Sequence, residues 1–203
     1  MLSESRIRIF WKLKTDQLFS ELFDFEDGEY KEISSLQNDI HNTKWEFLKE
    51  KMLPIITSNN MILDYGCGFG KYSKYFKRYL GVDINERVIE YCVRKYPKSQ
   101  FSKIELYQPL YALNTNIFFS SECLQYNDDE SILKILSSLP FTINSMYIYE
   151  MSKSDIPSDI ITLRSSRDYY NLINENLKVR KAEEFVHCIN NKEYRLTILE
   201  LER

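Results

Sequence analysis

Three of the chain's five glycines lie at alternate positions in the stretch "ILDYGCGFGKY", residues 62–72. Glycine lets the backbone adopt positive φ and lets a ligand approach without meeting a Cβ atom. An acid, Asp64, stands two residues before the first glycine, and a second acid, Asp83, ends the apolar run of "YLGVDIN". A carboxylate at the second position can accept hydrogen bonds from both hydroxyls of a ribose. The spacing therefore indicates a site for a polar, nucleoside-like ligand. The three glycines are Gly66, Gly68 and Gly70.

The glycine stretch is expected to connect a strand to a helix. Residues 61–65 form a short apolar run, and the amphipathic stretch that follows predicts a helix from about Phe69. Ligands bind at such junctions, off the carboxyl ends of the strands, and the free N–H groups of the helix would face the ligand. The spacing G-x-G-x-G differs from the G-x-G-x-x-G fingerprint of dinucleotide-binding proteins.

Further apolar runs alternate with amphipathic stretches and predict the rest of the fold. Strands that alternate with helices are typical of βαβ units and a mostly parallel sheet. The last two runs, 182–189 and 194–201, are joined by "NNK" and predict an antiparallel hairpin at the edge of that sheet. We expect an α/β, Rossmann-like, doubly wound sheet of seven strands, mostly parallel, with an N-terminal helical cap. The other predicted strands are 79–84, 100–106, 116–121 and 144–151, and the predicted helices are 85–97, 128–140 and 165–176.

The first 58 or so residues have helical periodicity. "TDQLFSELFDF", residues 15–25, spaces its apolar side chains for a helix, which Gly28 would end. "TKWEFLKEKMLPII", residues 43–56, repeats the pattern and is expected to close at Pro54. We therefore divide the chain into an N-terminal helical arm or lid, residues 1–45, and a larger domain, residues 46–203.

Composition limits the classes of partner and compartment. The 203 residues carry a net charge of -3, which gives no electrostatic footprint for nucleic acid. The sequence has no secretory signal and no apolar run long enough to cross a bilayer. Its four cysteines form no C-x-x-C pair, so we expect reduced thiols in a cytoplasmic protein rather than a zinc site or disulfides. Cys67, inside the glycine stretch, is interpreted as a small side chain filling a tight turn rather than as a nucleophile.

These motifs resemble the class I S-adenosylmethionine-dependent methyltransferases. "ILDYGCGFG" is similar to the family's first motif and "LGVDIN" to its second. "FFSSECLQYNDDESILKIL" resembles the fourth strand and following helix of its small-molecule members. The resemblance runs from about residue 45 to residue 203. It implies that the chain binds S-adenosylmethionine and releases S-adenosylhomocysteine.

The resemblance also implies roles for single residues. Asp64 and the three glycines would hold the methionine part of the ligand, with Cys67 inside the same loop. Asp83 would hold the ribose, and Ile84 would pack on the adenine. Glu105 would lie near the adenine amino group, and Ser120 would line the methionine end.

The acceptor is less well defined by the sequence. The chain lacks the D/N-P-P-Y/F motif of amino-methylating nucleic-acid enzymes and the Pro-Cys pair of cytosine-C5 enzymes. We expect a small-molecule acceptor, methylated on a hydroxyl or amine of a sugar, a nucleotide sugar or a secondary metabolite. Two alternatives stay open: a protein or RNA methyltransferase, and a non-catalytic partner protein with a methyltransferase fold. The oligomeric state is not predicted.

The segment after the fourth strand contains the candidate catalytic groups. Glu122 is favoured as the general base and Tyr126 as a group that orients the acceptor, with His41 as a further candidate. The acids Asp128, Asp129 and Glu130 could bind Mg²⁺. Acids at this position also cap a helix and interact with its dipole, and we prefer that interpretation. Methyl transfer is therefore expected to need no metal.

Overall fold

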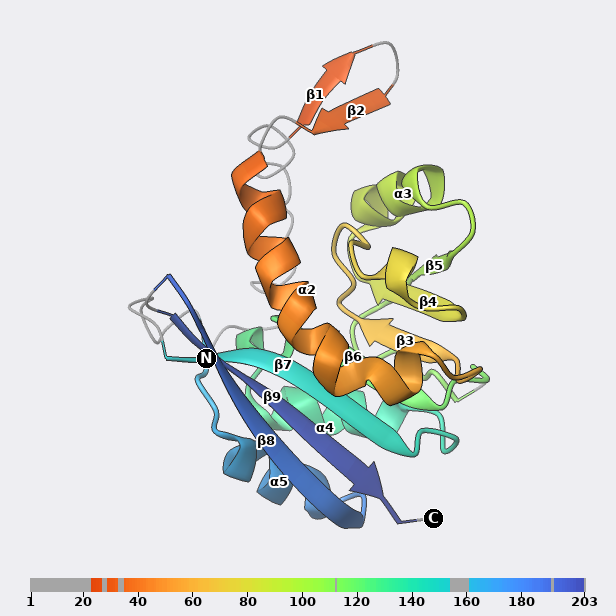
Figure 1. The fold of residues 1–203 in the computed structure, drawn as a ribbon. Helices are drawn as coiled ribbons and strands as arrows, with labels where there is room; N and C mark the ends of the chain where they lie inside the picture. The colour runs from red at the N-terminus through yellow and green to blue at the C-terminus, as the bar shows by residue number, and fades with distance from the viewer. Residues whose placement is uncertain are drawn as a thin grey trace.

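The computed structural model describes residues 23–26, 29–32, 35–111, 113–153, 161–190 and 192–202, with side chains from residue 40 onward. Its centre is a seven-stranded sheet in the order β5-β4-β3-β6-β7-β9-β8 (Figure 1). The first five strands of this order are parallel, and β9 runs antiparallel to both of its neighbours. The sheet and its edge hairpin are as the sequence predicts. The strands are β3 (Ile62–Tyr65), β4 (Tyr79–Asp83), β5 (Gln100–Lys103), β6 (Ile117–Ser121), β7 (Ser145–Lys153), β8 (Val179–Ile189) and β9 (Lys192–Leu201).

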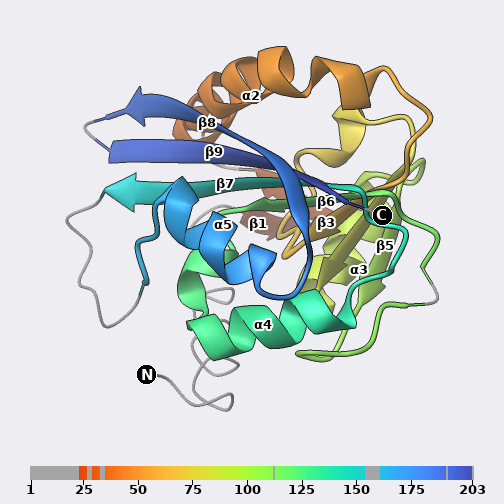
Figure 2. The same ribbon diagram turned by 90° about the horizontal axis from the view of Figure 1, so that it is seen from below.

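Helices cover both faces of this sheet. Figure 2 shows α2 (Ser35–Ile56) above the sheet and α4 (Asp129–Ser138) and α5 (Ser166–Asn174) below it. A further described helix, α3 (Glu86–Lys95), packs its residues Val88, Tyr91 and Cys92 on Phe69 and Phe101. Each of the three shorter helices has a side-chain cap at its start: Asn85 for α3, Asp128 for α4 and Ser165 for α5. These caps fix where the helices begin after the strands.

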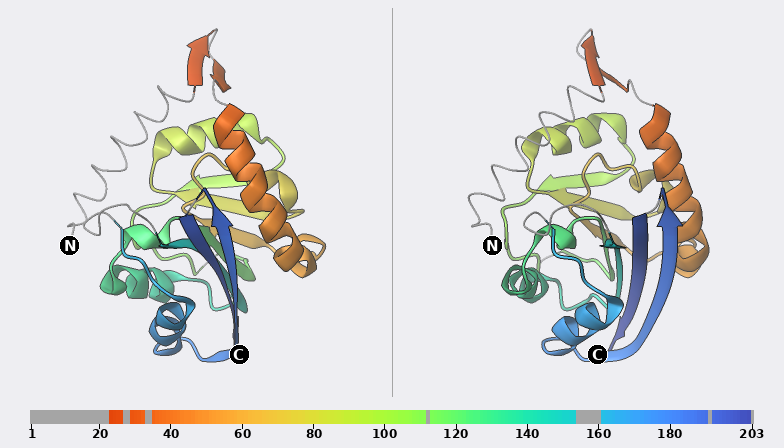
Figure 3. Two further views of the ribbon diagram at one scale, coloured as in Figure 1. Left: turned by 60° about the vertical axis from the view of Figure 1, so that its left-hand side comes forward. Right: turned by 90° about the vertical axis from the view of Figure 1, so that its left-hand side faces the viewer.

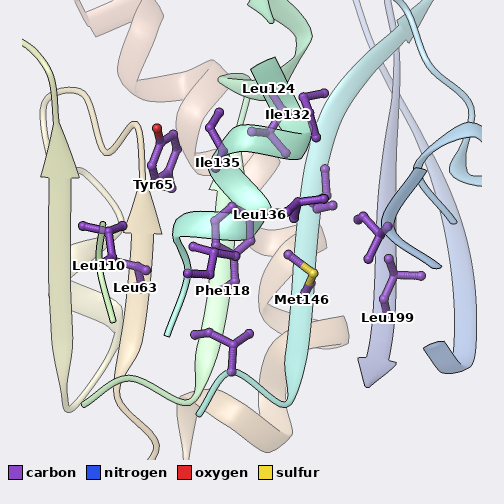
Figure 4. Close-up of a cluster of buried hydrophobic side chains, with 14 of the residues drawn as sticks. Leu63, Tyr65, Leu110, Phe118, Leu124, Ile132, Ile135, Leu136, Met146 and Leu199 are labelled. Carbon is purple, nitrogen blue, oxygen red and sulfur yellow. The ribbon is translucent and has the colours of Figure 1, made fainter. Parts of the chain in front are cut away.

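The two faces of the sheet have separate cores. Below the sheet, apolar residues of β3, β6, β7 and β9 pack against those of α4 (Figure 4). Above it, α2 inserts Trp45, Leu48 and Met52 against the aromatic and aliphatic side chains of the other face. Figure 3 shows from two sides that α2 lies along the sheet, close to β8 and β9. One helix thus covers much of the upper core.

The N-terminal region differs from the prediction. Residues Phe23–Glu26 (β1) and Glu29–Glu32 (β2) form an antiparallel pair, not the end of a helix. In "FDFEDGEYKE", apolar and acidic residues alternate before Asp-Gly, a dipeptide that favours hairpin turns. The helix predicted at 43–56 is confirmed as part of α2, although Pro54 lies inside the helix, which continues to Ile56. The predicted arm before residue 23 lies outside the described residues, and the predicted division at residue 45 falls within α2.

The helix predicted from Phe69 is wrong. The chain between β3 and β4 forms turns and one 3₁₀ segment, η1 (Ser73–Tyr75). Its aromatic side chains pack individually: Tyr75 stacks on Trp45 of α2 with ring centroids 3.7 Å apart, and Tyr72 lies edge-on to Phe119, 5.1 Å away. Aromatic residues are only moderate helix formers, and these tertiary contacts outweigh the helical periodicity. The site therefore has no α-helix N-terminus beside the glycine loop.

Candidate active site at the carboxyl ends of β3, β4 and β6

The glycine loop is folded back onto the end of β4. The N–H groups of Gly66 and Cys67 donate to the carbonyl of Val82 at 2.9 and 3.0 Å. The N–H of Gly68 donates to the Asp83 carboxylate at 3.1 Å. All three glycines of the loop have positive φ, between 49° and 74°. The loop thus needs glycine for its backbone conformation, as the sequence predicts.

The space beside each glycine separates structural needs from ligand binding. A Cβ at Gly66 would lie 2.7 Å from the Cβ of Cys123 and closer still to its sulfur. A Cβ at Gly70 would lie 2.8 Å from the ring of Phe101. A Cβ at Gly68 would meet no atom of the part of the chain that the structure describes within 4 Å. Other side chains of the protein therefore occupy the space beside Gly66 and Gly70. The space beside Gly68 is left open by the described residues, and a ligand can enter it.

Asp64 lies beneath this loop and is nearly inaccessible. Its side chain is 2% exposed, and its carboxylate accepts a hydrogen bond from the hydroxyl of Tyr79. Burial raises the pKa of Asp64 to about 7, and the charge of Asp83 adds to the increase while the Tyr79 hydrogen bond opposes it. A cation placed over the loop would favour the ionised form of Asp64.

Asp83 occupies the position at the end of β4 that was predicted for ribose binding. Its two carboxylate oxygens accept from the backbone N–H groups of Gly68 and Asn85, at 3.1 and 2.9 Å. Burial raises its pKa, and these backbone hydrogen bonds oppose the increase. Each carboxylate oxygen has a second lone pair, so the same group can anchor the loop and accept hydrogen bonds from a ligand.

The other residues predicted to bind the ligand differ in how far they are exposed. Ile84 directly follows Asp83 and is half-buried against the lower core. Cys67 is buried, and burial raises the pKa of its thiol, which agrees with its interpretation as a filling residue. Ser120 is fully buried and donates to Glu150 at 3.5 Å, so it does not line an open surface. Glu105 is exposed beyond β5 and pairs with Lys103 at 3.3 Å.

Glu122 follows β6 and forms an ion pair that the sequence did not reveal. It has a positive φ of 55°, which is uncommon for a residue with a side chain. Its N–H donates to the carbonyl of Tyr149 at 2.8 Å, and its carboxylate accepts from the ammonium of Lys44 on α2. Lys44 is only 8% exposed, and its ammonium lies 4.4 Å from the ring centroid of Tyr194. Residues 78 positions apart thus form a partly buried pair at the end of β6.

His41 lies one turn before Lys44 on α2 and faces the same region. Its ring centroid lies 4.7 Å from that of Tyr72, whose hydroxyl is 3.3 Å from the hydroxyl of Ser121 on β6. Burial lowers the pKa of His41 to about 4, with a further contribution from three lysine charges. Its Nε2 atom is buried and makes no hydrogen bond within the described chain. The structure therefore brings His41 and Glu122 to one side of the site.

The turn that holds Glu122 and Tyr126 is fixed from β7 by Glu150. The Glu150 carboxylate accepts from the N–H groups of Cys123 and Leu124, at 3.1 and 2.9 Å. It is 2% exposed, and burial raises its pKa to about 8 although these hydrogen bonds oppose the increase. Tyr126 is half-buried, and burial raises its pKa to about 12. Glu150 was missed because a lone acid inside an apolar strand has no local sequence signal.

The acidic residues after this turn lie at the beginning of α4. The Asp128 carboxylate accepts from the N–H of Ser131 at 2.7 Å and caps α4. Asp129 pairs with the buried guanidinium of Arg164, also at 2.7 Å, and Glu130 pairs with Lys134. The capping interpretation of Asp128 is therefore confirmed. Within the described ranges, no three His, Cys, Asp or Glu side chains are grouped to hold a metal ion.

Comparisons with known proteins agree with this geometry. Residues 63–134, from β3 into α4, match the family model described as a methyltransferase domain. The fold is similar to that of magnesium protoporphyrin IX methyltransferase from Synechocystis PCC 6803, solved with bound SAH, at a TM-score of 0.69 and 12% identity over 99% of this chain and 100% of that one. It is also similar to an S-adenosylmethionine-dependent methyltransferase from Mesorhizobium loti, at a TM-score of 0.60 and 14% identity over 78% of this chain and 97% of that one. No curated protein sequence matches this chain.

The domain match and the fold agree with each other. Residues 63–134 match a methyltransferase domain, and the sheet has the Rossmann-like fold of class I S-adenosylmethionine-dependent methyltransferases. Among the described helices, none is both long enough and apolar enough to cross a membrane.

Proposed function

We propose that the protein transfers a methyl group from S-adenosylmethionine to a small-molecule acceptor. The observation that carries this proposal is the open space beside Gly68. Gly68 adopts a positive φ, yet no atom of the described residues fills the space that a side chain would take. A ligand that lies against the loop is the physical reason for leaving the space empty.

The residues around this space suit S-adenosylmethionine. Asp83 presents a carboxylate at the end of β4 for the ribose hydroxyls, and Ile84 beside it offers an apolar surface for the adenine. Asp64, beneath the loop, supplies the charge that favours the ammonium of the methionine part. The ligand carries a methyl group already activated on a sulfonium, so the protein has to bind, orient and exclude water. Glu105 is the weakest candidate because it is exposed and paired with Lys103.

The acceptor would lie between α2 and the end of β6, where Glu122, Tyr126 and His41 are found. A small molecule is favoured because α2 and the β6 turn already close this side of the site through the Lys44–Glu122 pair. A net charge of -3 supports the absence of a nucleic-acid partner. The four cysteines of the chain form no disulfide, which supports a cytoplasmic location. The roles of Glu122 as base and Tyr126 as orienting group stay predictions.

The test is calorimetric titration with S-adenosylhomocysteine. We expect binding by the wild-type protein and at least tenfold weaker binding by Gly68→Ala, because the added Cβ enters the ligand space. Asn190→Ala is the matched control, since Asn190 has the same φ of 49° in the distant β8–β9 turn. Both variants should lose similar stability in thermal melts, and Asn190→Ala should bind normally. Failure of the wild-type protein to bind S-adenosylhomocysteine would contradict the proposed function.

A further inference from the structure

Neither Glu122, the predicted base, nor His41 is suited to take a proton at neutral pH, and Tyr126, the predicted orienting group, cannot replace them. The carboxylate of Glu122 is occupied by the ammonium of Lys44. His41 has a pKa lowered to about 4 by burial, so its neutral ring is a weak base. Tyr126 has a pKa raised to about 12 by burial and keeps its proton. An acceptor that must lose a proton to these groups would react slowly.

The two acids with pKa values near neutrality do not fill this gap. Asp64 and Glu150 are each 2% exposed, and each carboxylate is held by hydrogen bonds within the protein. A general base must come within hydrogen-bonding reach of the proton that it removes. An acceptor that is already ionised has no proton to lose, and it therefore needs no general base.

The ion pair on α2 marks where an anionic acceptor would bind. The Lys44 ammonium lies between the Glu122 carboxylate and the ring face of Tyr194, and it is shielded from water. A carboxylate therefore already occupies this position, supplied by the protein itself. The Glu122 side chain is 30% exposed, so it can move aside when another carboxylate takes its place on the ammonium.

The surrounding charges favour an anion as well. Among the residues that the structure describes, the charged groups that act on His41 are Lys71, Lys74 and Lys44, and all three are positive. Lys74 lies over the ring of Tyr75, 4.9 Å from its centroid, on the segment that packs against α2. Glu122 pairs with one of these lysines, Lys44.

We propose that the acceptor is a carboxylic acid, bound as its carboxylate by Lys44 in place of Glu122, and that the product is a methyl ester. This rests on the proposed function. A carboxylate oxygen forms the new bond to the methyl carbon, the carbon–sulfur bond breaks, and its electron pair stays on sulfur. A negative oxygen and a positive sulfonium become a neutral ester and a neutral thioether, and no proton moves. Shielding from water favours this step because it removes two charges.

The first test uses benzoate as probe and benzamide as its neutral counterpart, with the protein saturated with S-adenosylhomocysteine. We expect benzoate, but not benzamide, to raise the melting temperature. Lys44→Met should weaken benzoate binding about tenfold or more, and Lys44→Arg should retain it. Glu122→Gln should strengthen it, because the competing carboxylate is gone. Lys49→Met, on an exposed face of the same helix, is the matched control and should respond as wild type.

Several results would overturn the proposal. They are an equal response to both probes, no response to benzoate, or an unchanged benzoate response in Lys44→Met. S-adenosylhomocysteine affinity is measured for every variant, so a variant that fails to fold is recognised, with Lys44→Arg and Glu122→Gln still deciding the question. Loss of S-adenosylhomocysteine binding in the wild-type protein would instead contradict the proposed function.

A second test identifies the bond that is made. The protein is incubated with methyl-labelled S-adenosylmethionine and a small-molecule cell extract, and the labelled product is treated with mild alkali. A methyl ester releases its label as volatile methanol, whereas methyl ethers and methylated amines do not. Label that stays non-volatile would overturn the assignment of a carboxylate.

Discussion

Asp64 places a carboxylate where ionisation is costly for the fold and useful for binding. It is buried beneath the glycine loop, and its pKa is raised to about 7 mainly by that burial. A cationic amino group above the loop would favour the ionised form. Binding and folding therefore make opposite demands on the same side chain.

Asp64→Asn tests this conflict. Asparagine keeps an acceptor for the Tyr79 hydroxyl but can carry no charge. We expect a higher melting temperature than wild type at pH 8 and an affinity for S-adenosylhomocysteine about tenfold lower. In the wild-type protein, that affinity should rise between pH 6 and pH 8 as Asp64 ionises, and the rise should be absent in the variant. A wild-type affinity independent of pH would argue against this role.

At the scale of elements, the turn between β6 and α4 depends on β7 rather than on its own sequence. Glu150 accepts the N–H groups of Cys123 and Leu124, and Gln125 accepts the N–H of Met151 at 3.0 Å. Both connections join segments about 26 residues apart. The position of Glu122 is thus set from a neighbouring strand.

Two substitutions of Glu150 separate its hydrogen bonds from its charge. Glu150→Ala leaves two buried N–H groups without an acceptor, which should lower the free energy of unfolding by about 2–4 kcal/mol. Glu150→Gln keeps an acceptor oxygen and should change it by less than about 1 kcal/mol. Urea denaturation measures both values. Equal losses in the two variants would show that the hydrogen bonds to the turn contribute little.

The elements that the sequence predicts well are those set by local patterns. The strands carry short apolar runs, and Asn85 and Asp128 mark the helix starts with side chains that bond to the nearby backbone. The stretch after Gly70 has an equally helical pattern, but contacts with α2 decide its conformation. The glycine loop and Asp83 could be predicted because one short stretch contains their signal. The Lys44–Glu122 pair could not, because its members are 78 residues apart and neither is unusual alone.

For the whole molecule, the buried titratable groups predict how stability depends on pH. Burial raises the pKa of Asp64, Asp83 and Glu150, so the folded state keeps protons that the unfolded state has lost above about pH 5. The histidines oppose this, because their pKa values are lowered in the fold, but their effect fades above about pH 6.5 as the unfolded histidines lose their protons. Between pH 6.5 and pH 8 the folded state therefore binds more protons than the unfolded state, and the free energy of unfolding falls as pH rises.

Thermal melts across this range check the sign. We expect the melting temperature to fall from about pH 6.5 to about pH 8 in buffers of equal ionic strength. The double variant Asp64→Asn, Glu150→Gln should have a flatter profile, since two of the three acids no longer titrate. A melting temperature that rises over this interval in the wild-type protein would contradict the assignment of raised pKa values to these acids.

The order of the strands also bears on how the chain acquires its fold. β9 follows every other described element in the chain, yet it lies inside the sheet between β7 and β8. It supplies Leu196 and Ile198 to the core under α2, and Leu199 and Leu201 to the core on the opposite face. During synthesis, β7 and β8 therefore emerge from the ribosome before the strand that joins them, with unpaired backbone edges and incomplete cores. Such a nascent chain is exposed to aggregation until β9 emerges, and refolding has to wait for pairings between distant segments.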